Sequence, residues 1–232
     1  METFSNNTKH EKIPRILPVI PTMDVVVFPH TIVPLLVLDE RIINGINQAL
    51  EETKMVLLLA AKQKTEDSQG AIGTKDLYSV GTVASVMRLI KIPEGGVKIL
   101  VQGVYRARAD EILTDQDILH AQIKQLDFNE DSNDEIVAHV KNIKELTEKM
   151  ASAGQIFSPD FHIILSKIQD PEKVIDFVLS HLNLSVEQAQ TLLEQDSQSQ
   201  LLAGIYHELS REMEVSEVQE RIRNQARESM NK

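Results

Sequence analysis

The chain has 232 residues, of which 42% are hydrophobic, and a formal net charge of −11 at pH 7; this suits one large soluble domain or two smaller ones. It has no cysteine, which excludes disulfides, thiolate nucleophiles and cysteine-ligated zinc. Residues 1–124 hold 14 basic and 15 acidic residues, whereas 125–232 hold 10 and 20. An acidic surface repels phosphate backbones, so we expect no nucleic-acid partner.

The amino-terminal residues METFSNNTKHEK are polar and lack the apolar region of a secretory signal. No stretch of 18 apolar residues occurs in the sequence, so we expect no membrane span. We therefore predict a cytoplasmic location and treat residues 1–14 as a flexible terminus.

Short apolar runs alternate with turn signals from residue 15 to residue 125, which predicts a β-rich part. The run at 54–62 is wholly apolar, as in a strand buried on both faces. A Pro/Gly tetrad at 93–96 joins two further runs and predicts a hairpin. The complete expectation is a small curled sheet or partly closed barrel with strands at 15–20, 24–28, 32–38, 54–62, 78–92, 97–113 and 118–126, a helix at 39–50 and a surface loop at 61–78.

Two prolines divide the apolar stretch 24–40. Pro29 ends the strand predicted for DVVVF, because proline gives the ladder no N–H. His30 and Thr31 form a turn, and Pro34 needs an edge or a bulge. Asp39 is the expected cap of the following helix.

The second arm of the hairpin alternates in polarity. Val97, Ile99 and Val101 share one face, and the residues between them share the other. Gly103 inside this arm predicts a bulge or a sharp bend.

From residue 126 onwards the pattern has a helical period. Apolar positions spaced by three and four form one stripe of an amphipathic helix, at Ile136, Val140, Ile143, Leu146 and Met150. Later helix starts are predicted at Ser158-Pro159, at Asp170-Pro171, and at the capping boxes Ser185 to Gln188 and Ser197 to Gln200.

The last helix is predicted to exceed about 30 residues, or about 50 Å at the rise of an α-helix. Its distal part has only a thin apolar stripe of Val215, Val218 and Ile222. Such a stripe indicates a surface that awaits a partner.

No catalytic motif is found. The nine glycines lack the spacing of a phosphate-binding loop, and a Gly-x-Ser-x-Gly nucleophile elbow is absent. His207-Glu208 begins like a zinc motif, but Arg211 stands where the second histidine is needed. We therefore predict no catalytic, cofactor-binding or metal-binding residues and no cofactor in this chain.

A few polar residues have two interpretations. His120 and His139 fit surface positions better than metal ligands, and the acidic pairs at 51–52 and 110–111 fit solvated charge better than acid–base chemistry. Arg106 and Arg108 share one side of a strand, where they could hold a phosphate or carboxylate, although pairing with a nearby Asp or Glu is more common.

The order of segments resembles the amino-terminal domain of Lon proteases. The most specific part is the hairpin, with Gly81 to Ala84, Val101 to Gly103 and Arg106, and the resemblance runs from about Arg15 to the end of the chain. Two departures are Met23, where the family commonly has a polar residue, and His30, where it often has glycine.

The resemblance implies an α+β fold, with a PUA-like β-rich pseudo-barrel at 15–125, a helical bundle at 126–196 and a long linker helix at 197–232. It implies a non-catalytic module that captures unfolded, damaged or tagged proteins and helps a hexameric, ATP-dependent serine protease assemble. ATP and magnesium would belong to a missing ATPase domain if the chain is a fragment, which the overlong last helix favours.

Four alternatives stay open. The chain could be a purely structural assembly spacer, a stand-alone binding protein of the same domain type, a nucleic-acid reader, as other PUA-like folds are, or, as the least favoured, an enzyme acting alone. The resemblance supplies no short binding motif, so the residues that contact substrate are not predicted.

Overall fold

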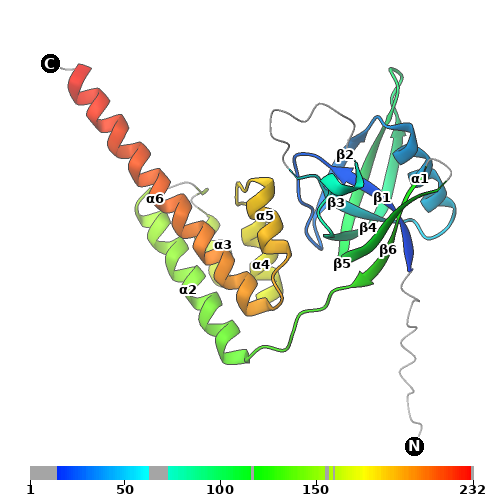
Figure 1. Ribbon diagram of the computed structural model, residues 1–232. Coiled ribbons are helices and arrows are strands. Elements are labelled where there is room, and N and C mark those ends of the chain that lie inside the picture. Colours follow the sequence, from blue (N-terminus) through cyan, green and yellow to red (C-terminus); the bar gives the residue numbers. More distant parts are fainter. Residues whose placement is uncertain (1–14, 63–72, 116–117, 155–156, 159, 231–232) are drawn as a thin grey trace, which may run out of the picture.

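A computed structural model of the chain describes residues 15–62, 73–115, 118–154, 157–158 and 160–230. The predicted flexible terminus at 1–14, most of the predicted loop at 61–78 and the predicted helix-starting Pro159 lie outside these residues. Figure 1 shows a β-rich part followed by helices that end in one long helix. This confirms the predicted α+β class.

Six strands form one sheet in the order β2-β5-β4-β3-β1-β6, and β5 also pairs with β6. The second pairing closes five strands into a barrel, with β2 as an added edge strand. Among the strand pairs of the described residues, β1 with β3 is the parallel one. The strands are β1 (Ile16–Thr22), β2 (Ile32–Val37), β3 (Met55–Ala60), β4 (Val80–Lys91), β5 (Val97–Asp115) and β6 (Ile118–Gln125).

Strand β5 is long enough for two other strands to pair with the same edge of it. Its first half pairs with β2, and its second half pairs with β6. The register of β4 against β5 shifts opposite Gly103, which confirms the predicted bulge. A Cβ at Gly103 would lie 2.3 Å from the carbonyl oxygen of Phe28, so only glycine permits this close approach.

Helix α1 (Glu40–Glu51) packs on the barrel through one face. Asp39 caps it as predicted, because its side chain accepts a hydrogen bond from the backbone N–H of Arg41. Ile42, Ile46 and Ala49 are buried at helical spacing and join the apolar interior of the barrel.

The strand predicted at 24–28 is wrong. Val26 and Val27 are buried as expected, but the segment has no regular secondary structure. Two backbone carbonyls of the segment accept hydrogen bonds from threonine hydroxyls and not from a neighbouring strand. Thr82 donates to the carbonyl of Val27 at 2.6 Å, and Thr22 donates to the carbonyl of Val25 at 2.6 Å. On the neighbouring edge of β5, residues 97–102 pair with β2 and residues 107–115 pair with β6, so only a short stretch is left beside this segment.

The second part contains α2 (Asn133–Ser152), α3 (Phe161–Lys167), α4 (Pro171–Leu179), α5 (Val186–Leu193) and α6 (Gln198–Met230). The cap at Asp170 and the capping box of Ser185 with Gln188 are confirmed. At Ser197 only half of the box forms, because the Gln200 side chain accepts from the backbone N–H of Asp196 instead.

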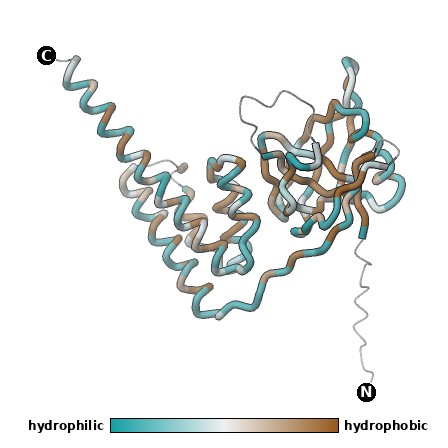
Figure 2. The backbone as a smooth tube through the Cα atoms, in the orientation of Figure 1, coloured by the Kyte–Doolittle hydropathy of each residue, from teal (hydrophilic) through white to brown (hydrophobic). Residues whose placement is uncertain are grey.

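Helices α2 and α6 lie side by side and share an apolar core with α3 and α4 (Figure 1). Val140, Ile143, Leu146 and Met150 of the predicted stripe are buried in it. Figure 2 shows that hydrophobic residues concentrate in the barrel strands, whereas the distal half of α6 is mostly hydrophilic. The domain boundaries given above stay a prediction, although strands end at Gln125 and helices begin at Asn133.

Candidate functional site

Two apolar surfaces lie on the outside of the barrel. The first of them is covered by helix α5. Residues from both parts of the chain form one buried cluster there, namely Val26, Ala60, Val80, Val186, Ala189 and Leu193. Gln190 of α5 is 2% exposed, and its side-chain amide donates to the carbonyl of Val80 at 2.8 Å. We call this contact between barrel and helices the junction.

Arg106 is the central polar residue of the junction. Its Nη1 donates to the carbonyl oxygens of Leu193 and Gln195 at 2.9 and 2.5 Å, where α5 ends. The guanidinium lies 4.0 Å from the ring centre of Phe128. Burial lowers the pKa of Arg106, although the nearby Asp196 and Asp127 oppose this. A cation near the carboxyl end of a helix also interacts favourably with the helix dipole, which stabilises the helix.

The sequence favoured an Asp or Glu partner for Arg106, and the charges of Asp196 and Asp127 do act on it, but neither carboxylate bonds to it directly. Its direct hydrogen bonds go to backbone carbonyls and not to a carboxylate. Arg108, on the same side of β5, is exposed. The two arginines thus form no common anion site, since one guanidinium is occupied within the fold.

A small pocket of about 90 Å³ lies beside the junction, among Phe28, Phe128, Ile175 and Leu179. At its rim, His30 Nδ1 lies 3.0 Å from Asp176 Oδ2, which links the turn before β2 to α4. Because Arg106, His30 and Asp176 of its lining are bonded within the fold, we interpret the pocket as part of the packing between barrel and helices.

The second apolar surface is not covered. The registers of β2, β4 and β5 place nine side chains in three rows on one side of the sheet: Ile32, Gln102 and Ser85; Pro34, Leu100 and Arg88; Leu36, Lys98 and Ile90. We call this surface the outer face. Its inward-pointing neighbours Val33, Leu35, Val97, Ile99 and Val101 belong to the barrel interior.

The apolar side chains of the outer face are unusually open. Ile32, Leu36 and Ile90 are 51%, 62% and 48% exposed, and Met87 in the adjoining bulge is 52% exposed. Leu38, just after β2, is 66% exposed. A contiguous exposed apolar patch of this kind marks an interaction surface.

Strand β2 is the open edge of the outer face. Gly103 exchanges backbone hydrogen bonds with the turn that precedes β2, so the alternation of an antiparallel ladder turns the nitrogen of Pro34 away from β5. Proline is tolerated there because no donor is needed, as predicted. Its missing N–H also blunts the edge against sheet-to-sheet aggregation.

Two further titratable residues contact other parts of the fold. His120 lies within 3.1 Å of the Gln48 side chain, so it supports α1. Burial raises the pKa of Glu212, whose carboxylate accepts from the backbone N–H of Asn183. Among the described residues, no group of three or more His, Cys, Asp or Glu side chains could hold a metal ion.

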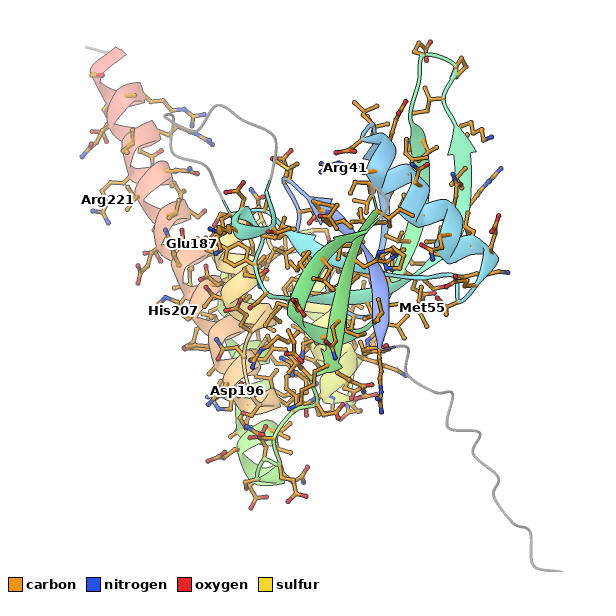
Figure 3. All side chains as sticks on the ribbon, turned by 45° about the vertical axis from the view of Figure 1, so that its right-hand side comes forward. Arg41, Met55, Glu187, Asp196, His207 and Arg221 are labelled. Atoms are coloured by element: carbon orange, nitrogen blue, oxygen red, sulfur yellow. The ribbon has the colours of Figure 1, made fainter. Side chains whose placement is uncertain are left out.

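The distal part of α6 is a third exposed feature. In Figure 3, Asp196 marks the turn between α5 and α6, and Arg221 marks the stretch of α6 farther along. Val215, Val218 and Ile222 are exposed along this stretch. None of the described helices is long and apolar enough to span a bilayer.

A barrel joined through a buried contact to a helical bundle with a long last helix defines a two-part module. The same fold is found in the N terminal domain of a Mycobacterium avium complex Lon protease, with a TM-score of 0.65 at 22% identity over 84% of this chain and 98% of that one. A Lon N-terminal domain protein from Xanthomonas campestris gives 0.55 at 14% identity, over 81% and 95%.

Sequence comparison agrees with the fold. A family model of the ATP-dependent protease La (LON) substrate-binding domain matches residues 16–211. Lon protease of Desulfovibrio desulfuricans is 37% identical over 224 residues, which are 96% of this chain and 25% of that protein. The Escherichia coli K12 Lon protease is 30% identical over 93% of this chain and 27% of that protein.

The chain therefore belongs to the Lon substrate-binding domain family. It spans about a quarter of the length of the curated relatives it matches, at 25% and 27%. The predicted resemblance is confirmed.

Sequence reasoning did not find the outer face. Leu100, Lys98 and Gln102 were assigned to one side of the hairpin, but their neighbours on β2 were not. The Pro/Gly turn places Lys91 opposite Val97, and this register could have indicated Ile90 beside Lys98. The pairing of β2 with β5 could not be read from the sequence in this way, because no short turn joins these two strands.

Proposed function

We propose that the chain is a substrate-recognition module that binds exposed apolar segments of unfolded, damaged or tagged proteins through the outer face. The observation that carries the proposal is the uncovered apolar surface on β2, β4 and β5, in a family whose domain is described as substrate-binding. A folded protein hides its apolar residues and offers little to such a surface, whereas an unfolded chain presents them.

Binding by one outer face would be weak, because it lacks a deep pocket for a single anchor residue. Several copies around one pore would raise the apparent affinity through effective concentration. This favours a module that works within an assembly, and we propose a hexameric ATP-dependent serine protease in the cytoplasm as that setting. ATP, magnesium and peptide-bond cleavage would then belong to other domains.

The test compares two forms of one model protein, permanently unfolded and native, for retention by the immobilised 232-residue chain. We expect retention of the unfolded form alone. Equal and negligible retention of both forms at high protein concentration would contradict the proposal.

A second candidate function is a spacer that holds protomers together. It is favoured by the distal stripe of α6, because Val215, Val218 and Ile222 are spaced by three and four and are exposed. Light scattering over a concentration series, on the chain and on Val218→Glu, separates the two functions. Oligomers that dissociate in the variant, without capture of unfolded protein, support the spacer.

A further inference from the structure

The outer face carries positive charge inside an acidic chain. Strands β2 and β4 together with residues 97–102 contain Arg88, Lys91 and Lys98 and no acidic residue. By contrast, residues 125–232 have 10 basic and 20 acidic residues, a balance of 10 − 20 = −10. The local sign of this surface is therefore opposite to that of the whole chain.

Two of these cations stand among the apolar residues. Lys98 lies between Leu36 and Ile90 in one row, and Arg88 follows Leu100 in the next. Both are exposed, and within the described residues neither makes an ion pair or a side-chain hydrogen bond. Their charges are thus available to a ligand.

We propose that the outer face selects apolar polypeptide segments that also carry acidic residues, and that it disfavours segments with basic flanks. This inference rests on the proposed function, because it concerns the selectivity of the same surface. An extended segment that places apolar side chains against Leu36 and Ile90 brings its neighbouring side chains to Lys98. An acidic neighbour gains from this contact, whereas a basic one is repelled.

A polypeptide fits this surface better than a polyanion does. Phosphate polymers bind through many cations that follow their backbone, and their affinity grows with each phosphate neutralised. On the outer face, only two cations stand among five apolar side chains, which are Ile32, Pro34, Leu36, Leu100 and Ile90. Alternating apolar and acidic groups match this pattern.

Solvent screening sets the reach of the effect. At physiological ionic strength charges act over about 8 Å, so the acidic excess of the helical part is largely screened from a segment on the outer face. The contacts with Arg88 and Lys98 are closer and survive. In Figure 1, the β4–β5 hairpin projects at the top of the barrel, whereas helices α2 to α6 lie to the left of the barrel.

The experiment measures the affinity of the full 232-residue chain for three fluorescent peptides. They share one apolar sequence and are flanked by Asp, Ser or Lys. We expect the Asp-flanked peptide to bind about threefold more tightly than the Ser-flanked one and the Lys-flanked one about threefold more weakly, as for exposed ion pairs. The differences should shrink at about 1 M salt, while binding of the Ser-flanked peptide persists.

Charge-neutral variants locate the selectivity. Arg88→Gln with Lys98→Gln should give three equal affinities, because no charged side chain then remains on the outer face to distinguish the flanks. The matched control is Arg108→Gln with Lys124→Gln, a paired arginine and lysine that are exposed on β5 and β6 outside the outer face. This control should keep the wild-type order.

Each other result contradicts the inference in a distinguishable way. Equal affinities of the wild-type chain for all three peptides would overturn the selectivity and leave the proposed function standing. Loss of the order in the control would place the selectivity elsewhere. No binding of any peptide would contradict the proposed function and this inference together.

Discussion

The junction and the outer face are two apolar surfaces of one barrel, and they differ in the burial and hydrogen bonding of their polar side chains. At the junction, Arg106 and Gln190 are buried and donate to carbonyl oxygens across the contact. On the outer face, Arg88 and Lys98 are exposed and have no charged partner among the described residues. The junction is a completed contact, whereas the outer face is an open one.

This difference teaches that apolar content alone does not identify a binding site. Both surfaces are rich in aliphatic side chains, and both lie on strands of the same sheet. Burying polar groups is costly unless they are hydrogen-bonded, so buried donors that are hydrogen-bonded across a contact, such as those of Arg106 and Gln190, indicate architecture. Exposed apolar rows with unpaired charges indicate a surface that a partner covers.

Arg106→Ala should have the largest effect of the substitutions considered. It removes two charge-assisted hydrogen bonds to the end of α5 and the packing on Phe128. We expect the free energy of unfolding to fall by about 3 kcal/mol, since charged hydrogen bonds and buried packing are lost together. Urea denaturation measures the change.

Arg108→Ala is the matched control, because Arg108 is exposed two residues along the same strand. Its free energy of unfolding should stay within about 0.5 kcal/mol of the wild-type value. Equal losses for the two variants would show that the junction contributes no more than an ordinary surface position.

Gly103→Ala should disturb the junction indirectly. Its Cβ would meet the Phe28 carbonyl oxygen at 2.3 Å, so the backbone at Phe28, next to the buried Val26 and Val27, must shift. We expect a loss of about 2 kcal/mol in the free energy of unfolding, as for overpacking. Gly73→Ala is the control, because its nearest atom would be 3.6 Å away; a wild-type stability for Gly103→Ala would contradict the close approach.

Substitutions of His30 should change the free energy of unfolding least. They separate the cost of its backbone conformation from the contribution of its side chain. Its φ of 68° lies in the left-handed region, and its ring contacts Asp176. His30→Ala loses the contact and keeps the backbone cost, whereas His30→Gly loses both. The glycine variant should therefore exceed the alanine variant by about 1 kcal/mol in thermal or urea unfolding. Equal stabilities would contradict this account of the turn.

Much of the fold could be predicted from local patterns. The caps at Asp39, Asp170 and Ser185 follow from short-range hydrogen bonding, and the stripe of α2 follows from helical spacing. The left-handed backbone at His30 also explains why the resemblance predicted glycine there.

Long-range features could not be predicted in the same way. The apolarity of residues 24–28 correctly indicated the burial of Val26 and Val27, but whether the segment forms a strand depends on its long-range neighbours. The partners of Arg106 lie 87 and 89 residues farther along the chain. The outer face depends on the absence of a covering helix, which no local pattern encodes.

The most direct test of the central claim compares two groups of apolar residues that are each about half exposed. One variant carries Ile32→Ser, Leu36→Ser and Ile90→Ser on the outer face. The control carries Val137→Ser, Ile163→Ser and Ile164→Ser on the helical part, where the side chains are 55%, 46% and 47% exposed. Denaturation curves first establish that both variants are folded.

The measurement is the affinity of each variant for one permanently unfolded protein. The outer-face variant should bind at least about tenfold more weakly than the wild-type chain, because a few buried side chains carry most of a binding energy. The control should bind as the wild-type chain does. Equal binding by all three chains, or a loss confined to the helical variant, would contradict the assignment of the outer face as the substrate-binding surface.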